Sequence, residues 1–332
     1  MAGFFGFFDF NKEGPGVSKD QPKKSAFFLY FEILFRKFWG LVTVNLIYCI
    51  YFIPVLALCL LFINLIGKVT ADNALLYLFC FSPVILLGPA NAGITKVTRD
   101  FVREEPGFIW SDFHESFKKN WKQSIAVSIF QYIGGVALFG ALSFYYNLLQ
   151  KGGLYVIPFY LAVSLTFIFI VMQFYLQLMV VTLDLNLKNI FKNAVFLSIL
   201  ALGKNILAIL VTLLLVAVEI ILVYYSLASY AAMLLMLAFT GMLFFALLSY
   251  TINSFAFGTI KKFIIDPYYK QNPLETSEGV KQVLKSGGDR EVELPEYVYE
   301  NGRLIHRSII EKEIEYEEAE NENKEQKTES KD

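Results

Sequence analysis

Glu219 is the residue whose position most strongly suggests chemistry, because it alone carries charge in the stretch from Asn205 to Ile260. An ionisable side chain at the centre of a membrane helix costs roughly 2.5 to 3.5 kcal/mol on insertion scales, so it is a functional candidate. A carboxylate facing the interior of a bundle could couple transport to a proton. The alternative is a place near the outer membrane interface, since Tyr224 follows closely. Both interpretations of this intramembrane carboxylate stay open.

Uncharged polar side chains also fall within the apolar stretches, where they could join helices or line a path for a solute. Hydrogen bonds between helices are their ordinary use inside a membrane. A solute path would use the same residue types on faces that converge. The sequence does not separate the two roles for Asn45, Gln131, Asn147, Gln173, Gln177 and Asn253.

Metal, cofactor and enzymatic chemistry find little support in the sequence. The cysteines lie inside apolar stretches without CxxC spacing, which is typical of buried packing residues. His114 and His306 are far apart, so we expect no zinc site. The phosphate-loop, zinc-protease, nucleophile-elbow and dinucleotide-binding motifs are missing. We therefore expect no metal, no cofactor, no catalytic residues and no enzymatic activity.

The elements that must position these residues are long runs without Asp, Glu, Lys or Arg, which dominate the chain between residues 38 and 260. A hydrocarbon core about 30 Å thick needs about 20 apolar residues per helix. The composition, 56% hydrophobic and 17% aromatic, exceeds what a water-soluble surface tolerates. We predict an all-α polytopic membrane protein with a six-helix transmembrane bundle, with spans near 39–66, 73–94, 122–149, 153–183, 205–225 and 229–258.

Prolines and chain length indicate where the spans bend or end. Pro54, Pro83 and Pro89 mark expected kinks, because proline removes a backbone donor. The apolar stretch 194–203 could extend the fifth span towards its N-terminus. A turn is required within 205–260, because one helix of that length is far too long for a bilayer.

Lys and Arg alternate in number from loop to loop. Six precede the first span, one follows it, and six lie between the second and third spans. Short loops rich in Lys and Arg stay in the cytoplasm, so we predict a multi-pass protein with both termini cytoplasmic. The net charge of −1 argues against nucleic-acid binding through overall basicity. The predicted partner is the lipid bilayer.

Residues 25–37 predict an amphipathic helix before the first span. Aromatic residues recur at helical spacing, while Glu32, Arg36 and Lys37 occupy a narrower polar side. This pattern favours a helix lying at the cytoplasmic membrane interface. The alternative is that the first span simply begins early.

The charged loop from Lys96 to Lys122 contains a second amphipathic stretch. After Pro106-Gly107, Ser111 and Asp112 are candidate N-caps, with Glu115 in capping-box spacing. The aromatic stripe that follows, with lysines nearby, could either anchor a helix at headgroup depth or dock a cytoplasmic partner. The candidate docking residues are Trp110, Phe113, Phe117, Lys118 and Trp121.

The composition becomes polar after Lys262, and two further segments follow. In EYVYENGRLIHR, residues 296–307, Asn301-Gly302 separates two alternating stretches, which predicts a β-hairpin that docks on the cytoplasmic face or a partner. Ten acidic and four basic residues in 311–332 predict a disordered tail. The predicted parts are a cytoplasmic segment with an interfacial helix (1–37), a six-span domain (38–262), a cytoplasmic hairpin segment (263–310) and an acidic tail (311–332).

Three stretches resemble a known family. They are FNKEGPGVSKD (10–20), FEILFRKFW (31–39) and, most specifically, GPANAGITKVTRDFVREEPGFIWSDFHESFKKNWKQS (88–124). They are similar to the YesL-like family, domain of unknown function 624, from the N-terminus through the sixth span. The resemblance implies a bacterial integral membrane protein, often associated with carbohydrate utilisation, sugar transporters and sensor systems. It supplies no catalytic residues.

Two functions of different classes follow. The first is an accessory or regulatory membrane protein that contacts a sugar transporter or sensor kinase complex through the 96–122 loop. The second is a small-solute permease with a path through the helix bundle. The resemblance and the charged loop favour the first, while Glu219 and the polar residues in the spans keep the second open.

Overall fold

A computed structural model of the chain describes residues 25–66, 78–149, 152–285, 294–300 and 303–316. Within these ranges, six helices are long and apolar enough to cross a membrane. The prediction of an all-α polytopic bundle with six spans is therefore confirmed. The candidate spans are Phe38–Ile66, Leu78–Val102, Trp121–Leu149, Gly153–Thr182, Leu202–Ser226 and Tyr230–Gln271.

The spans are built from named helices with shorter elements between them. The principal ones are α2 (Phe38–Ile66), α4 (Gly88–Val102), α6 (Trp121–Leu149), α7 (Val156–Thr182), α9 (Leu202–Ser226), α10 (Tyr230–Phe239) and α11 (Phe245–Ile260). The connecting helices are α1 (Ala26–Arg36), α5 (Ile109–Lys119), α8 (Leu187–Leu200), α12 (Asp266–Gln271) and α13 (Ser277–Lys285).

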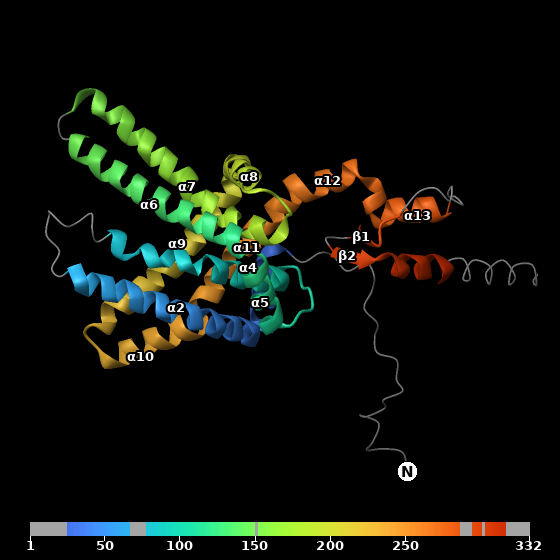
Figure 1. The fold of residues 1–332 in the computed structure, drawn as a ribbon, viewed down its shortest axis with the longest axis horizontal. Coiled ribbons are helices and arrows are strands. Elements are labelled where there is room, and N and C mark those ends of the chain that lie inside the picture. The colour runs from blue at the N-terminus through green and yellow to red at the C-terminus, as the bar shows by residue number, and fades with distance from the viewer. Residues whose placement is uncertain (1–24, 67–77, 150–151, 286–293, 301–302, 317–332) are drawn as a thin grey trace, which may run out of the picture.

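The connections gather at two ends of the bundle. In Figure 1, α5, α12 and the C-terminal strands lie towards one end, which we call the α5 end, while the α6–α7 and α9–α10 connections lie at the other. This arrangement agrees with the alternation of Lys and Arg between loops. The assignment of the α5 end to the cytoplasm stays a prediction.

α4 is the most deeply buried span. Nearly all of its residues from Gly88 to Phe101 are buried, between α2, α6, α7 and α11. Small residues permit this close packing, because a Cβ on Gly88 would lie 2.6 Å from the carbonyl oxygen of Ser124 in α6. The GPANAG sequence at its start is therefore a packing surface.

The prolines affect the two N-terminal spans differently. Pro83 and Pro89 stand at the starts of a 3₁₀ segment (Ser82–Leu87) and of α4, where their missing N–H groups are tolerated. Pro54 lies inside α2, which remains one helix. The expected extension of the fifth span by residues 194–203 is wrong, because α8 ends at Leu200 and α9 begins at Leu202.

The last span continues far beyond the predicted end at 258. It runs without interruption from Tyr230 to Gln271 and includes π-helical segments at Thr240–Phe244 and Lys261–Ile265. Pro267 stands in the first turn of α12, where a proline is compatible with a helix. The helix therefore links the bundle directly to the C-terminal part of the chain.

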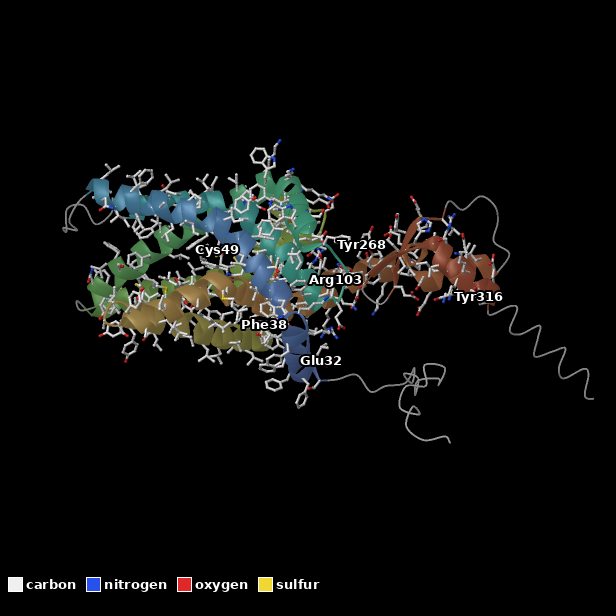
Figure 2. All side chains as sticks on the ribbon, turned by 90° about the horizontal axis from the view of Figure 1, so that it is seen from below. Glu32, Phe38, Cys49, Arg103, Tyr268 and Tyr316 are labelled. Atoms are coloured by element: carbon white, nitrogen blue, oxygen red, sulfur yellow. The ribbon has the colours of Figure 1, made fainter. Side chains whose placement is uncertain are left out.

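The C-terminal part forms a small structure at the α5 end (Figure 2). Strands β1 (Tyr297–Glu300) and β2 (Arg303–His306) pair antiparallel with Glu300 opposite Arg303, which confirms the predicted hairpin. The turn residues Asn301-Gly302 lie outside the described ranges. The ring of Tyr299 stacks on Tyr269 of α12 with 4.0 Å between centroids, so the hairpin rests on the extension of the last span.

The boundary of the acidic tail differs from the prediction. Residues 307–316 are helical, and Ile310 and Ile314, one turn apart, bury against Val280 and Val298. This apolar pair orders a segment whose overall composition is acidic. Residues 317–332 lie outside the described part of the chain.

α1 is a separate helix that ends at Arg36 and presents two different sides. On one side, the hydroxyl of Tyr250 in α11 donates a 2.8 Å hydrogen bond to the carbonyl of Tyr30. On the other, Phe27, Phe28 and Phe35 are about 70% exposed. An exposed phenylalanine side next to a docked side fits the predicted interfacial helix.

Candidate functional site

α5 is fastened to the bundle by one buried ring and one hydroxyl. Phe113, which is 0% exposed, lies against Gly93 of α4, where an added Cβ would come 2.9 Å from the ring. The ring also stacks on Tyr51 of α2, with 5.9 Å between centroids. The hydroxyl of Ser116 donates to the carbonyl of Ala92 at 3.2 Å. α5 is therefore a fixed element of the bundle.

The five candidate docking residues fall into two groups. Phe113 is buried, and the half-buried Phe117 packs against the same apolar cluster. Trp110 and Trp121 are 61% and 48% exposed, and Lys118 is exposed as well. The two phenylalanines hold α5 in place, and the other three residues face away from the core. Trp110, Trp121 and Lys118 are therefore the candidate residues that are accessible for direct contact with a partner.

The predicted start of α5 at Ser111 or Asp112 is wrong. The helix begins at Ile109, after the extended residue Phe108, and the N–H of Asp112 already donates to the carbonyl of Phe108. Asp112 thus lies in the first turn, where a carboxylate interacts favourably with the helix dipole. Burial raises the pKa of the Asp112 carboxyl, and the nearby Lys96 opposes that shift.

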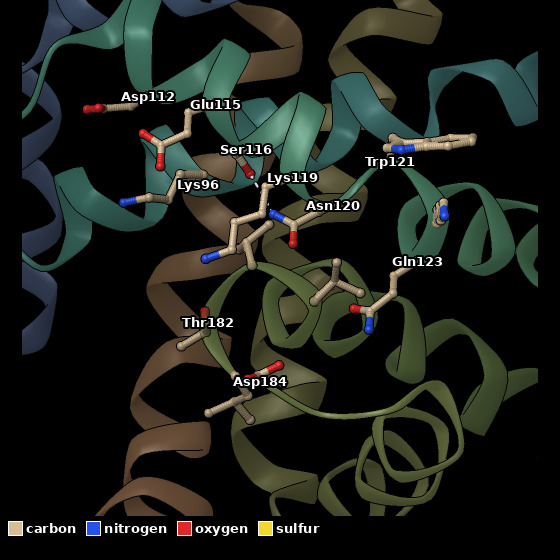
Figure 3. Close-up of a pocket in the computed structure, with 14 residues that line it drawn as sticks. Lys96, Asp112, Glu115, Ser116, Lys119, Asn120, Trp121, Gln123, Thr182 and Asp184 are labelled. Atoms are coloured by element: carbon tan, nitrogen blue, oxygen red, sulfur yellow. Dashed lines mark hydrogen bonds between the residues drawn. The ribbon is translucent and has the colours of Figure 1, made fainter.

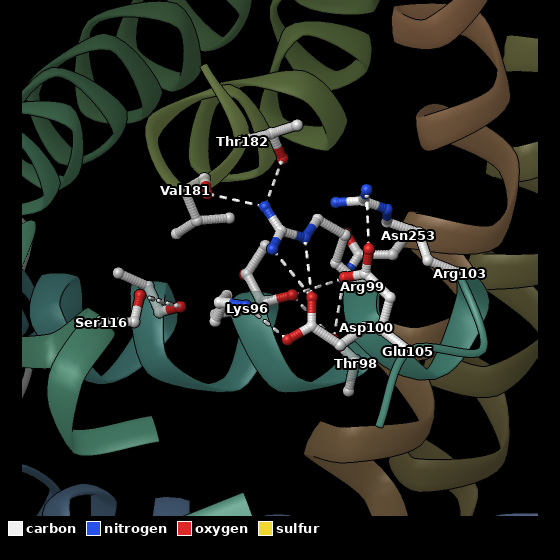
Figure 4. A network of polar contacts seen from close by, with 12 residues as sticks. Lys96, Thr98, Arg99, Asp100, Arg103, Glu105, Ser116, Val181, Thr182 and Asn253 are labelled. Atoms are coloured by element: carbon white, nitrogen blue, oxygen red, sulfur yellow. Dashed lines mark hydrogen bonds and ion pairs between the residues drawn. The ribbon is translucent and has the colours of Figure 1, made fainter. Parts of the chain in front are cut away.

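A buried ion pair joins α4 to the end of α7 (Figure 4). Arg99 and Asp100 are 5% and 6% exposed, and two guanidinium nitrogens of Arg99 approach Asp100 Oδ1 at 3.0 and 2.8 Å. Arg99 also donates to the carbonyl of Val181 at 2.7 Å and to the hydroxyl of Thr182 at 3.2 Å. Lys96 completes the network at 2.6 Å from Asp100 Oδ2.

The position of this network corrects the predicted end of the second span. The helix continues to Val102 instead of stopping at 94, so Lys96, Arg99 and Asp100 belong to its last turns. The charges are compatible with burial because they neutralise one another and because Arg99 also donates to the carbonyl of Val181 and the hydroxyl of Thr182 at the C-terminal end of α7. The four-residue spacing of Lys96 and Asp100 is the sequence signal that could have revealed it.

A groove of about 650 Å³ lies beside the network, between α5 and the C-terminal end of α7 (Figure 3). Its lining carries both signs of charge, with Lys96, Lys119, Lys122, Asp112, Glu115 and Asp184. Such a lining suits a polar or charged peptide segment more than an apolar ligand. Among the described residues, His, Cys, Asp and Glu form no group of three or more that could hold a metal ion.

Glu219 lies on α9 and faces Thr240, the first residue of the π-helical segment. The hydroxyl of Thr240 donates to Oε1 of Glu219, and Oε2 is buried without a hydrogen-bond partner in the described part of the chain. Glu219 precedes the end of α9 at Ser226 by about two turns, roughly 10 Å. The carboxyl group therefore faces the neighbouring span and lies well apart from the α5 end.

The comparison with known families concerns the part of the chain that holds α5. Residues 38–141 match the model of a family described as "Protein of unknown function, DUF624". This stretch of the chain is similar to the DUF624 family. The resemblance to YesL-like proteins is consistent with this family. No curated protein and no solved structure matches the chain.

The matched region covers the α5 surface of the protein. It includes α2, the Gly88–Val102 helix with its ion pair, α5 and most of α6. Glu219 and the C-terminal hairpin lie outside the match. The family description names no activity.

Proposed function

We propose that this protein belongs to the DUF624 family and is an accessory or regulatory component of a carbohydrate uptake or sensing system, which it contacts through the exposed side of α5. We further propose that it resides in a bacterial cytoplasmic membrane with both termini in the cytoplasm and has no enzymatic activity of its own. The carbohydrate link and the bacterial source come from the resemblance to YesL-like proteins.

The observation that carries the proposal is the two-sided character of α5. Its inner side is locked to the bundle by Phe113 and Ser116, while Trp110 and Lys118 stand outward. A rigid element loses little conformational entropy on binding, and an exposed tryptophan is a common anchor of protein interfaces. The mixed-charge groove beside α5 adds polar contacts that could select one partner.

Photocrosslinking in native membranes tests the proposal. A photoreactive amino acid replaces Lys118, and a matched variant carries it at Tyr225, which is 57% exposed near the opposite end of the bundle. We expect capture of a sugar transporter subunit or a sensor kinase from position 118 and its absence from position 225. Equal capture at both positions would indicate non-specific proximity.

The permease alternative predicts a different result from the same protein. If no partner is captured at position 118 and purified protein in proteoliposomes conducts a solute, the accessory role is refuted. If a partner is captured at position 118 and the protein conducts no solute in proteoliposomes, the accessory role is supported. A Trp110→Ala variant that keeps its fold and loses the captured partner would locate the contact on α5.

A further inference from the structure

The membrane-spanning part of the bundle contains a cavity of about 240 Å³, separate from the groove at the α5 end. It lies between α2, α4, α6, α7 and α11. None of the residues that line it is charged. The polar side chains of the lining include Asn91, Gln131, Gln173, Gln177, Ser249 and Asn253.

The wall formed by α2, α4 and α11 has its polar groups paired within the protein. The hydroxyl of Tyr48 donates to Oδ1 of Asn91 at 2.8 Å. The amide of Asn253 donates to the carbonyl of Thr95 at 3.1 Å and to the hydroxyl of Thr98 at 2.7 Å. These residues use their hydrogen-bonding capacity to join spans, as polar residues in membrane helices commonly do.

The opposite wall, on α7, is different. Gln177 is 8% exposed, and both of its amide atoms, Nε2 and Oε1, are buried without a partner in the described part of the chain. Gln173 donates to the carbonyl of Phe169 at 2.7 Å, which leaves its own Oε1 without a partner there. Four-residue spacing puts both glutamines on one face of α7.

We infer that this cavity binds one small uncharged molecule that carries hydroxyl or amide groups. The three unpaired amide atoms are buried beside the cavity, so a turn of the Gln173 and Gln177 side chains lets the Gln177 amide donate to such a molecule and lets the two oxygens accept from it. An apolar occupant would leave these buried amides unpaired, and an ion would lack a neutralising charge in the lining. The cavity has the liquid volume of about eight water molecules, which accommodates a polyol of up to about six carbons.

The inference is independent of the proposed partner, because binding to the cavity requires the bundle alone. The ion pair between Arg99 and Asp100 lies one helical turn along α4 from Thr95 of the lining, about 6 Å towards the α5 end. The cavity and the mixed-charge groove thus occupy successive levels of the bundle. A ligand in the cavity would be out of reach of the exposed docking residues on α5.

Saturation-transfer NMR on the full-length protein in lipid nanodiscs tests the inference. The probes are glycerol, glucose and urea, with glycerol 3-phosphate as the charged counterpart and cyclohexane as the apolar one. We expect saturable binding of at least one of the first three probes and none of the charged probe. Absence of saturable binding for all three, or a preference for cyclohexane, would overturn the inference.

Variants of the lining identify the site. Gln177→Leu and Gln173→Leu keep the approximate volume and remove the free amide atoms, so we expect about tenfold weaker binding of the favoured probe. Gln123→Leu is the matched control, because Gln123 lines the groove and its amide donates to the carbonyl of Leu185 at 3.1 Å. The affinity of the Gln123→Leu variant for the favoured probe should equal that of the unaltered protein. Unchanged affinity in both lining variants would also overturn the inference.

The melting temperature without a probe separates binding from a structural role. Removing an unpaired buried amide should leave the melting temperature of Gln177→Leu unchanged or higher. A fall in melting temperature with unchanged probe affinity would show that Gln177 serves packing alone, contrary to the inference.

Discussion

Phe113 and Trp110 are three residues apart on α5 and have opposite surroundings. Because the Phe113 ring is fully buried, Phe113→Ala should lower the free energy of unfolding by about 3 to 5 kcal/mol. Trp110→Ala removes an exposed ring and should change it by less than about 0.5 kcal/mol. Titration with a denaturing detergent, monitored by circular dichroism, measures both values. Equal losses would mean that Trp110 also packs in the folded protein.

The Arg99–Asp100 pair gives a second prediction, in which a double substitution is milder than a single one. Asp100→Ala leaves the Arg99 guanidinium buried with less compensation, so the expected loss of stability is about 3 to 5 kcal/mol. The double variant Arg99→Met with Asp100→Leu should lose less, since no charge of the pair remains in the interior. The comparison uses the same unfolding titration.

A surface ion pair provides the control for that experiment. Glu311 lies 2.8 Å from Arg307 in the C-terminal helix and its side chain is 42% exposed. Glu311→Ala should cost no more than about 1 kcal/mol, because water screens exposed pairs. A double Arg99/Asp100 variant less stable than Asp100→Ala would contradict the role assigned to the buried pair.

The sequence could identify the aromatic residues of α5 but could not assign each to a side. Spacing of three and four residues places Trp110, Phe113 and Phe117 on neighbouring parts of a helix. Which of them enters the core depends on where α4 offers a gap, and Gly93 provides that gap opposite Phe113. Such a match between residues 20 positions apart leaves no periodic signal. The same limitation explains why Gln173 and Gln177 could be noted as polar without showing that they share a cavity.

Among the helices, one asparagine joins α2 to the last span by hydrogen bonds. The amide of Asn45 donates to the carbonyls of Thr240 and Gly241 at 3.0 and 2.7 Å, and its oxygen accepts from the N–H of Ala246 at 3.0 Å. The π-helical segment changes the local hydrogen-bonding pattern, and Asn45 satisfies its backbone groups from outside the helix.

We therefore expect Asn45→Leu to destabilise the bundle by about 2 kcal/mol, at about 0.6 kcal/mol for each of three interhelical hydrogen bonds. Asn147→Leu is the matched control, because Asn147 is exposed on α6. Thermal unfolding of the two purified variants measures the difference. Equal melting temperatures would show that the π-helical segment does not need Asn45.

The helices themselves were predictable where hydrophobicity alone decides them. Six spans follow from five apolar runs, because a bilayer imposes the length of each span and the run 205–260 is long enough for two. The end of α4 and the break between α8 and α9 were missed for physical reasons. Lys96, Arg99 and Asp100 neutralise one another within α4, but in the sequence such a cluster of charges looks like a loop. The break at Ala201 interrupts an apolar stretch without any polar residue that would mark it.

For the molecule as a whole, the alternation of Lys and Arg predicts which end faces the cytoplasm. A reporter inserted after Lys151, between α6 and α7, should be extracytoplasmic, and one inserted after Gly107, before α5, should be cytoplasmic. Paired alkaline phosphatase and fluorescent-protein fusions read the two locations. A cytoplasmic reporter after Lys151 would reverse the orientation and remove α5 from reach of a cytoplasmic partner.

The uninterrupted helix from Tyr230 to Gln271 has a mechanical consequence. Its 42 residues span about 63 Å, roughly twice the thickness of the hydrocarbon core. A tilt of about 10° within the membrane would therefore displace the far end by roughly 5 Å for a protruding length of about 30 Å. The hairpin that stacks on Tyr269 would travel with it. The last span thus acts as a lever arm, through which small rearrangements among the spans become larger displacements of the C-terminal structure.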